Sequence, residues 1–422
     1  MAKINVLVFP AGEINSVELH DALATCVNIN LMGASSKERH GKYVFADYTP
    51  NLPLISDADF FEKFNAFLES KHVDVIFPTH DTIATFFADN LDQIHAKVIV
   101  ADKKTAAVCR DKKLAYELFA DCDFVPRIYH ENFQYPVFIK PRDGQGAVGA
   151  RLVKDSKMLP LDIDKYVVCE YLPGEEYTVD CLTDKDGRLA IVSPRSRQRI
   201  LGGVCTAGRV EELTDEIKDI AETINQRLVF KGLWFFQIKK DAVGKWKLLE
   251  ISTRCAGTMC LTRARGINLP LLSVYVAMGY DISVHPNDCA ITMDRTLISR
   301  YAVDYPYHTV YFDFDDTLIV RDKVNLKAIW FLYQCLNEGK KVVLLTKHAN
   351  EIYQSMQKYK IDKALFDEVI HIQLDDKKSK YVDPDAAIFI DNAYQERADV
   401  QSVHHIPVFD VDGIEVLMDW RI

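Results

Sequence analysis

The chain has 422 residues, 27% of them charged and 48% hydrophobic, which is enough for about three folding units of ~100–150 residues each. Its formal net charge of −10 disfavours a nucleic-acid partner, because such binding depends on clustered Lys and Arg. We expect neither a membrane span nor a secretory signal, because the apolar runs are too short. The ten cysteines form no Cys-x-x-Cys pair, which favours reduced thiols in a cytoplasmic protein.

Residues 1–102 alternate short apolar runs with helical patterns. Strands are predicted at Ile4–Phe9 and Val73–Phe77, and helices at Val17–Cys26 and Thr82–Leu91. A further helix carries the aromatic stripe of residues 60–68, whose helical spacing is typical of core packing. This rhythm predicts an α/β domain with a parallel sheet.

Residues 103–305 have a different rhythm, with strands separated by Gly-containing turns. Helices are predicted at Thr105–Phe119, Asp215–Leu228 and Leu269–Met278. The predicted strands are Val137–Lys140, Ala150–Val153, Tyr166–Glu170, Glu176–Leu182, Leu189–Val192, Leu233–Lys240, Lys245–Ile251 and Thr296–Val303. Strands joined by hairpins indicate an α+β domain with antiparallel sheets.

Residues 306–422, which follow a linker at Asp304–His308, return to alternation. Strands are predicted at Thr309–Phe312, Lys341–Thr346, Glu368–Ile372, Ala386–Ile390 and Ile406–Phe409, with helices between most of them. This pattern predicts a small, doubly wound α/β domain.

A glycine-rich segment follows the strand that ends at Lys140. Gly144, Gly146 and Gly149 fit the G-x-G-x-x-G pattern of dinucleotide sites, but that pattern needs a helix to begin at the loop, whereas Arg151–Val153 continues as a strand. A hairpin tip is the better interpretation. Its backbone N–H groups can cover a triphosphate while Lys140 supplies a cation, and a surface hairpin without a ligand remains the alternative.

Two further groups suit a nucleotide site. Glu170, Tyr171 and Leu172 end a strand before a Pro-Gly pair, a hinge whose backbone can read an adenine edge, and Glu176 beyond it can accept ribose hydroxyls. Gln237 and Glu250 lie on strands joined by the turn at Gly244. They can meet across that hairpin to hold Mg²⁺.

In their order and spacing, these residues resemble the ATP-grasp superfamily, especially its carbamoyl phosphate synthetase-like branch, over residues 1 to about 305. The resemblance implies a preceding α/β domain and a ligase that transfers the γ-phosphoryl group of ATP to a carboxylate, after which an amine opens the acyl phosphate. The roles it implies are ATP phosphate binding for Lys112 and Lys140, adenine binding for Glu170, ribose binding for Glu176, Mg²⁺ or Mn²⁺ binding for Gln237 and Glu250, and contact with the γ-phosphate or acyl phosphate for Arg254. Ser252 stands where many relatives have an Asn two positions after the metal-binding Glu, and its hydroxyl is a candidate ligand for a metal or a phosphate oxygen.

A basic segment is the candidate site for an anionic substrate. Arg195, Arg197 and Arg199 precede Gly202 and Gly203, and guanidinium groups bind carboxylates and phosphates through paired N–H donors. A solvated basic strand is an equal alternative.

The last domain opens with a strand that runs into Asp313 and Asp315. Two carboxylates at this spacing can share a divalent ion while Asp313 attacks phosphorus and Asp315 protonates the leaving oxygen. Thr346 and Asp391 end later strands, where α/β sheets place their sites. Lys378 is the candidate phosphate ligand, with Lys377 and Lys380 as competitors.

These features resemble the haloacid dehalogenase (HAD) superfamily over residues 309–422. The resemblance implies a nucleophile at Asp313, an acid/base at Asp315, phosphate ligands at Thr346 and Lys378, and Mg²⁺ bound by Asp313, Asp315 and Asp391. Asn392 replaces a common second acid. The segments between Thr317, Thr346 and Lys378 are too short for the ~50-residue inserted lid of small-substrate phosphatases, so an open site is expected.

The sequence thus predicts a bifunctional enzyme, an ATP- and Mg²⁺-dependent amide-forming ligase fused to a phosphatase. Its expected partners are a small carboxylate and an amine, either of which can carry a phosphate, and by analogy a second copy in a homodimer. Two alternatives remain: a phosphatase whose N-terminal part senses nucleotide, and an ATP-grasp kinase.

Overall fold

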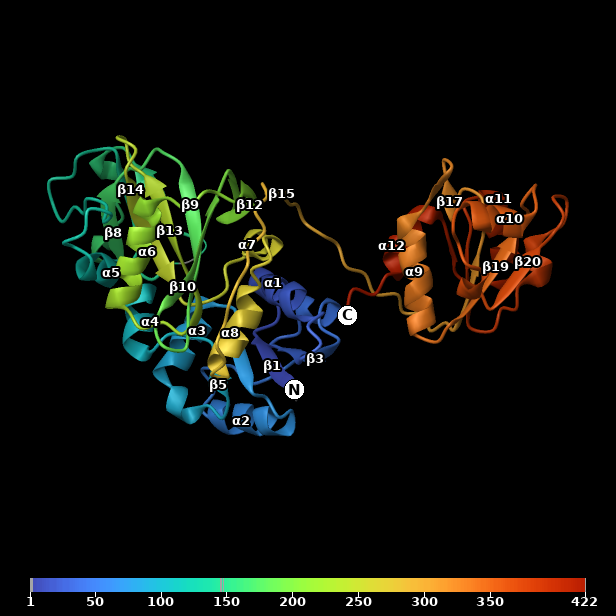
Figure 1. Cartoon of the computed structure of the whole chain (residues 1–422), viewed down its shortest axis with the longest axis horizontal. Helices are drawn as coiled ribbons and strands as arrows, with labels where there is room; N and C mark the ends of the chain where they lie inside the picture. The colour runs from blue at the N-terminus through green and yellow to red at the C-terminus, as the bar shows by residue number, and fades with distance from the viewer. Residues whose placement is uncertain (1–2, 145, 147, 422) are drawn as a thin grey trace. The chain divides into compact units, whose positions relative to one another are not determined.

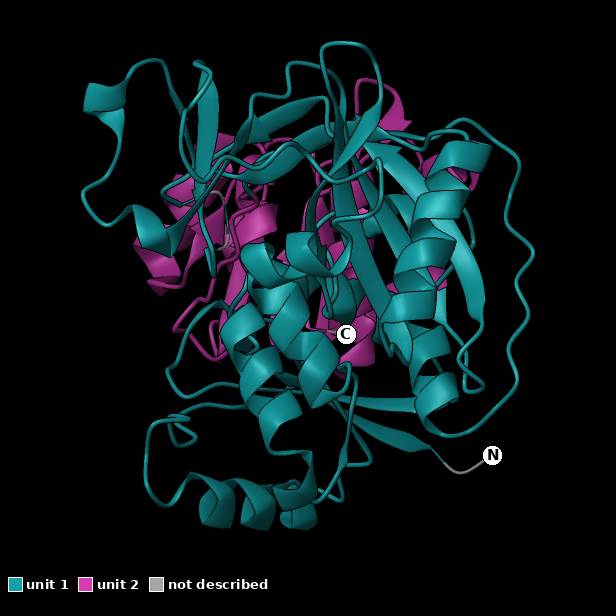
Figure 2. Cartoon of the chain, turned by 90° about the vertical axis from the view of Figure 1, so that its left-hand side faces the viewer, with its two compact units in different colours: residues 1–297, 422 teal, residues 298–421 magenta. Residues whose placement is uncertain are grey.

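The structure is a computed structural model that describes residues 3–144, 146 and 148–421. The chain divides into two compact units, residues 1–297 and residues 298–421 (Figure 2). The first unit contains both sheet systems predicted upstream, so the boundary between residues 102 and 103 remains a prediction. The division between the units falls shortly before the predicted boundary at residues 305 and 306.

The first unit begins with a five-stranded parallel sheet in the order β3-β2-β1-β4-β5 (Figure 1). Val6 and Val8 face one core and Leu7 and Phe9 another, because side chains alternate along a buried strand. The aromatic stripe of residues 60–68 packs into the second core, as predicted. The strands and helices of this parallel-sheet region are β1 Ile4–Phe9, α1 Ile14–Leu23, β2 Ile29–Ala34, β3 Asp47–Thr49, α2 Phe60–Ser70, β4 Val75–Pro78, α3 Asp81–Asp89 and β5 Lys97–Val98.

Antiparallel sheets follow, in the orders β10-β9-β13-β14, β7-β6-β8 and β11-β12-β15. This confirms the predicted antiparallel arrangement. The strands are β6 Val137–Pro141, β7 Arg151–Val153, β8 Tyr166–Glu170, β9 Glu176–Thr183, β10 Leu189–Ser196, β11 Arg199–Leu201, β12 Val204–Arg209, β13 Gly232–Lys240, β14 Trp246–Ser252 and β15 Thr292–Asp294. The helices are α4 Lys103–Arg110, α5 Lys112–Leu118, α6 Asp215–Arg227, α7 Cys260–Ala264 and α8 Leu269–Ala277.

Strand β13 shows why the functional face lies where it does. Trp234, Phe236 and Ile238 enter a core that α6 covers. The alternate residues Phe235 and Gln237 therefore face the opposite side of the sheet, where both line a cavity.

Two predictions in this region are wrong. The helix predicted at Thr105–Phe119 is two helices, α4 and α5, because Asp111 adopts an extended conformation between them and its carboxylate caps Lys113. The strand predicted at Thr296–Val303 does not form, and the strand in this region is β15, which pairs with β12.

The second unit has a five-stranded parallel sheet in the order β20-β19-β16-β21-β22. Core residues cover both of its faces, as the predicted doubly wound pattern requires. The strands of the second unit, in chain order, are β16 Thr309–Phe312, β17 Ile319–Val320, β18 Lys323–Val324, β19 Lys341–Thr346, β20 Glu368–His371, β21 Ala387–Ile390 and β22 Val408–Phe409. Of these, β17 and β18 pair with each other outside the five-stranded sheet. Its helices are α9 Leu326–Asn337, α10 Ile352–Lys358, α11 Tyr394–His404 and α12 Ile414–Leu417.

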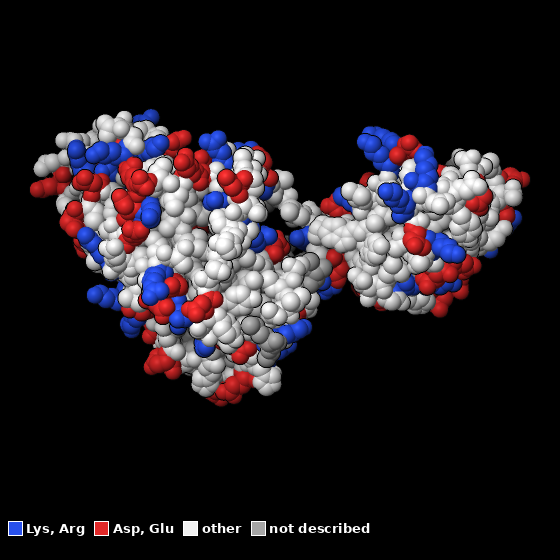
Figure 3. Space-filling view, in the orientation of Figure 1, with Lys and Arg blue, Asp and Glu red and all other residues white. Residues whose placement is uncertain are grey.

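The surface carries both signs of charge. Over the face shown in Figure 3, acidic and basic side chains of the first unit are interspersed. Within the described ranges, no helix is both long enough and apolar enough to cross a membrane.

Candidate functional site

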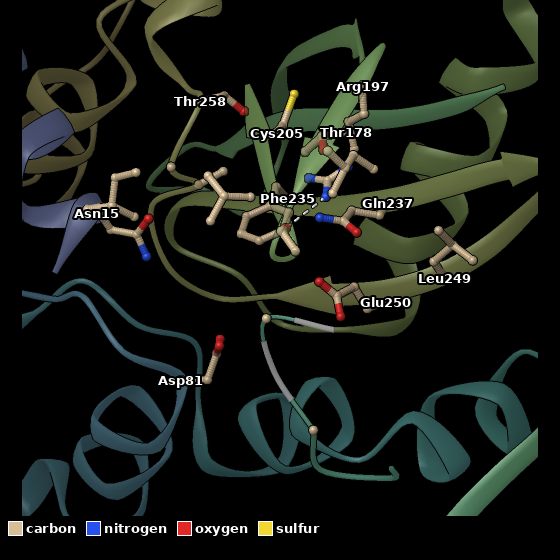
Figure 4. A pocket seen from close by; sticks show the side chains of 18 of the residues that line it. Asn15, Asp81, Thr178, Arg197, Cys205, Phe235, Gln237, Leu249, Glu250 and Thr258 are labelled. Atoms are coloured by element: carbon tan, nitrogen blue, oxygen red, sulfur yellow. Dashed lines mark hydrogen bonds between the residues drawn. The ribbon is translucent and has the colours of Figure 1, made fainter. Parts of the chain in front are cut away.

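A cavity of about 610 Å³ lies in the first unit, between the loops of the parallel sheet and the antiparallel sheets (Figure 4). It brings together ten of the residues selected from the sequence: Lys112, Lys140, Gly144, Gly146, Glu176, Arg195, Arg197, Gln237, Glu250 and Arg254. Residues 145 and 147 of the glycine-rich loop lie outside the described residues. This convergence is the arrangement that a shared nucleotide cleft requires.

Two lysines approach the cavity from different elements. The Lys140 ammonium is buried, where it donates to Tyr116 Oη and to the Leu249 carbonyl at 3.0 Å. Burial lowers the pKa of Lys140, although nearby acidic groups act in the opposite direction. Lys112 Nζ donates to the Gly144 carbonyl at 2.7 Å, so this lysine ties helix α5 to the glycine-rich loop.

The candidate metal ligands occupy the β13–β14 hairpin. Gln237 pairs directly with Glu250 across the two strands, and Glu250 Oε2 lies 3.7 Å from Lys112 Nζ. The described residues contain no group of three or more His, Cys, Asp or Glu side chains arranged around one ion. Mg²⁺ often takes only one or two protein ligands and completes its shell with phosphates and water, so a Gln-Glu pair fits such an ion.

Ser252 and Arg254 make a separate contact that the sequence did not predict. The Ser252 hydroxyl donates to Asp81 Oδ1 at 3.0 Å, and Arg254 donates to both Asp81 oxygens at 2.9 Å. Burial acts to raise the pKa of Asp81, but Arg254 and Ser252 outweigh it, so that pKa is lowered. Asp81 begins α3 at the edge of the parallel sheet, and its partners lie about 170 positions later in the chain.

The residues proposed for adenine and ribose lie differently. Glu170 Oε1 accepts a hydrogen bond from the Arg127 backbone N–H at 2.8 Å, and Leu172 is buried. Neither these two nor Tyr171 is among the residues that line the cavity. Glu176 does line it, with its carboxylate 2.8 Å from Arg197 Nε and 3.1 Å from Lys239 Nζ.

The three arginines of the basic segment have three different surroundings. Arg195 is buried and donates to both oxygens of Asp180, at 2.7 and 3.0 Å, and to Thr258. Arg197 is beside Glu176 and donates to the Gly203 carbonyl at 3.2 Å. Arg199 is exposed on β11 and pairs with Asp294 at 2.8 Å. The segment is therefore not a continuous basic surface.

In the second unit, Lys378 Nζ lies 2.5 Å from Asp313 Oδ1 and 2.6 Å from Asp391 Oδ2. Burial raises the pKa of Asp313 to about 6, although Lys378 acts to lower it, and burial likewise raises the pKa of Asp391. The competing lysines face elsewhere, since Lys377 pairs with Asp399 and Lys380 with Asp376. The sheet topology makes this cluster, because β16 and β21 are neighbours.

Two hydroxyl groups and a histidine surround this cluster. The Thr346 hydroxyl is buried with no hydrogen-bond partner among the described residues, and the Thr317 hydroxyl lies 3.4 Å from Asp313 Oδ2. Asp315 turns to His348, with Oδ2 2.7 Å from Nδ1. His348 was missed in the sequence, where its position two residues after Thr346 was the available signal.

Sequence comparison finds proteins that are similar to part of the first unit. Residues 162–296 match a family described as "ATP-grasp in the biosynthetic pathway with Ter operon". A segment of 157 residues, 35% of this chain, is 27% identical to the 3-methyl-D-ornithine--L-lysine ligases of Methanosarcina mazei and Methanosarcina barkeri. The chain spans less than half of the length of these curated relatives, 42% and 43% respectively.

Solved structures of other proteins also resemble a large part of this chain. An L-amino acid ligase from Bacillus licheniformis is similar with a TM-score of 0.54 and 16% identity, over 66% of this chain and 75% of that one. Biotin carboxylase from Campylobacter jejuni is similar with a TM-score of 0.55 and 17% identity, over 66% of this chain and 72% of that one. The N-terminal parallel sheet and the antiparallel sheets thus have the ATP-grasp fold, which confirms that part of the resemblance. None of these findings identifies residues 298–421 as a HAD domain.

Proposed function

We propose that the first unit is an ATP- and Mg²⁺-dependent ligase that joins a carboxylate to an amine, with amino acids as the substrate class. The observation that carries this proposal is the convergence of Lys112, Lys140, Gln237 and Glu250 on one cavity within an ATP-grasp fold. The amino-acid class is supported by the names of the related proteins, which are ligases of amino acids.

The residues suit a phosphoryl transfer that depends on charge neutralisation. Lys140 and Lys112 would contact phosphate oxygens, and Gln237 and Glu250 would hold the ion that neutralises the transferring group. The γ-phosphoryl group moves to a carboxylate oxygen and ADP leaves. The amine then attacks the acyl carbon, the C–O bond to phosphate breaks, and inorganic phosphate departs. Arg254, fixed by Asp81, would stabilise the anionic acyl phosphate.

The test is ADP release from the purified full chain against a panel of amino-acid carboxylates and amines. Lys140→Met should reduce the rate at least ~100-fold, since it removes a cation from the transferring group. Lys245→Met is the matched control, because Lys245 is exposed in the turn between β13 and β14. Hydroxylamine should trap a hydroxamate. ADP release without a hydroxamate would favour a kinase over a ligase. The absence of ADP release with every carboxylate and amine tested would reject both functions.

We propose separately that the second unit is a phosphomonoester phosphatase, with Asp313 as nucleophile and Asp315 as acid/base. Its support is the cluster of Asp313, Lys378 and Asp391 at the ends of neighbouring strands, together with the HAD-like motifs. The buried Thr346 hydroxyl and Lys378 would bind phosphate oxygens, and Asp313 and Asp391 would hold Mg²⁺.

This second proposal has its own test. The full chain should hydrolyse 4-nitrophenyl phosphate in the presence of Mg²⁺, and Asp313→Asn should abolish that hydrolysis while ADP formation by the first unit continues. Hydrolysis that persists in Asp313→Asn would reject Asp313 as the nucleophile. Loss of both activities would argue against separate sites.

A further inference from the structure

Arg295, just after β15, presents one part of its guanidinium group to the cavity of the first unit. Nε donates to the Cys205 carbonyl at 3.1 Å and Nη1 to the Gly257 carbonyl at 2.7 Å. Its backbone N–H donates to the Thr206 carbonyl at 2.9 Å. Two side-chain bonds and one backbone bond thus fix the direction of the group.

The remaining nitrogen, Nη2, is buried and has no hydrogen-bond partner among the described residues. A buried donor without a partner is destabilising, and more so when it is charged. Such a group in a folded protein calls for a bound partner. For a guanidinium group the best partner is a carboxylate or a phosphate, which forms charge-assisted hydrogen bonds with it.

Asn15 supplies a complementary acceptor at the same end of the cavity. Its Nδ2 donates to the Thr79 carbonyl at 3.0 Å, which leaves Oδ1 for another partner. A Cβ atom added to Gly257 would lie 2.9 Å from Asn15 Oδ1 and 3.9 Å from Arg295 Nη2. The glycine therefore lies close to both the donor of one side chain and the acceptor of the other.

This end is separate from the phosphate-binding end. Figure 4 shows Asn15 and Thr258 on the other side of the cavity from Gln237 and Glu250. A carboxylate that receives the γ-phosphoryl group must lie near the nucleotide and its ion. A carboxylate at Arg295 is accordingly one that is not activated.

We propose that Arg295 Nη2 and Asn15 Oδ1 form a subsite for the amine-donating substrate, which is an amino acid held by its free carboxylate at Arg295 and by an N–H group at Asn15. The inference rests on the proposed ligase function and extends it. It predicts that the second substrate needs a carboxylate that does not react.

Binding can be tested without turnover. Saturation-transfer NMR would be recorded on the full chain with ADP, Mg²⁺ and an equimolar mixture of the twenty standard L-amino acids. At least one amino acid should give a signal that falls at least ~10-fold in Arg295→Met, and its α-amide should bind at least ~10-fold more weakly to the unmodified protein. No signal from the unmodified protein, or a signal unchanged in Arg295→Met, would overturn the subsite.

Turnover then separates this subsite from activation of the first substrate. Arg295→Met should form hydroxamate with hydroxylamine, which has no carboxylate, within about twofold of the unmodified rate. Amide formation with an amino acid should fall at least ~10-fold through KM. An equal loss with both nucleophiles would assign Arg295 to activation instead. Absence of ADP release from the unmodified protein would reject the ligase, while Arg295-dependent binding would still support the subsite.

Two variants guard against misfolding. Arg209→Met, on neighbouring β12, removes an exposed arginine that pairs with Glu211 and should leave binding unchanged. Gly257→Ala leaves Arg295 unchanged and puts a methyl group close to both side chains. It should weaken amino-acid binding like Arg295→Met, and normal binding in Gly257→Ala would contradict the subsite.

Discussion

Buried or partly buried ion pairs connect different segments of the first unit. Asp81 pairs with Arg254, Asp180 with Arg195, and Glu18 with Arg263. Two of the three connect the parallel sheet region to the segment after β14. Removing one partner of such a pair is costly, because the other charge remains buried.

Glu18 gives the first unit a predictable pH response. Burial raises the pKa of Glu18 to about 7 from 4.5, with Arg263 acting to lower it. Between these pH values the folded chain binds the proton that the unfolded chain has released. Stability therefore falls as pH rises through this range and levels off above it, by about 3 kcal/mol in total.

Glu18→Gln should remove this fall. Relative to the unmodified protein, its free energy of unfolding should improve by about 3 kcal/mol from pH 5 to pH 8. Urea unfolding at four pH values measures this, with the exposed Glu62→Gln as the control. Parallel pH profiles for Glu18→Gln and the unmodified protein would show that Glu18 is not the group responsible.

Lys378 and Lys377 offer a matched pair in the second unit. Lys378→Met leaves Asp313 and Asp391 buried without their cation, so the free energy of unfolding of the second unit should fall by about 3–5 kcal/mol at pH 7.5. If the proposed phosphatase function holds, that activity should be lost as well. Lys377→Met breaks an exposed pair with Asp399 and should change stability by less than about 1 kcal/mol. Thermal melting and 4-nitrophenyl phosphate hydrolysis report both. Equal effects of the two substitutions would contradict a role for Lys378 that Lys377 does not share.

Local sequence patterns predicted some of the candidate residues and missed others for a physical reason. Gln237 and Glu250 could be predicted because one hairpin with a turn at Gly244 sets their register. Asp81 and Arg295 were not, since each meets its partners only after distant segments pack. Arg195 matched a basic pattern, yet its pairing with Asp180 depends on which strand lies beside β10.

At the level of elements, the β6–β7 hairpin depends on glycine. Gly149 has a φ of +77°, and a Cβ atom there would lie 2.9 Å from Pro141 Cγ. Gly149→Ala should strain the hairpin by about 1–2 kcal/mol. If the proposed ligase function holds, it should raise the KM for ATP several-fold without changing the KM for the amine. Gly187→Ala is the control, because Gly187 has a φ of +82° with open space around it. Steady-state kinetics compare the two variants. An equal rise of the KM for ATP in Gly149→Ala and in Gly187→Ala would mean that backbone strain alone is responsible.

Element prediction succeeded where hydrophobic periodicity continued without a competing polar contact. The strands Ile4–Phe9 and Thr309–Phe312 form as predicted. The helix over residues 105–119 is broken because the Asp111 carboxylate also pairs with Arg142, a residue beyond the reach of any local pattern. Residues 296–303 have apolar side chains but no neighbouring strand to pair with.

At the scale of the whole molecule, the two units have separate hydrophobic cores. The clusters around Phe312 and Tyr311 contain only residues of the second unit, and those around Val6, Trp234 and Leu7 only residues of the first. Residues 295–307 between them have no helix or strand, and Leu297 is 97% exposed. Each unit therefore contains what it needs to fold.

Limited chymotrypsin digestion should cut first within residues 297–301, because an exposed segment outside helices and strands enters a protease site most readily. Two stable fragments should result. If the proposed functions hold, the larger should retain ADP release and the smaller phosphate release, each within about twofold of the intact chain. Mass spectrometry identifies the cut, and the assays follow on separated fragments. A first cut inside either unit would contradict the division, and activity lost by one fragment but restored on mixing would show that its site needs residues of the other.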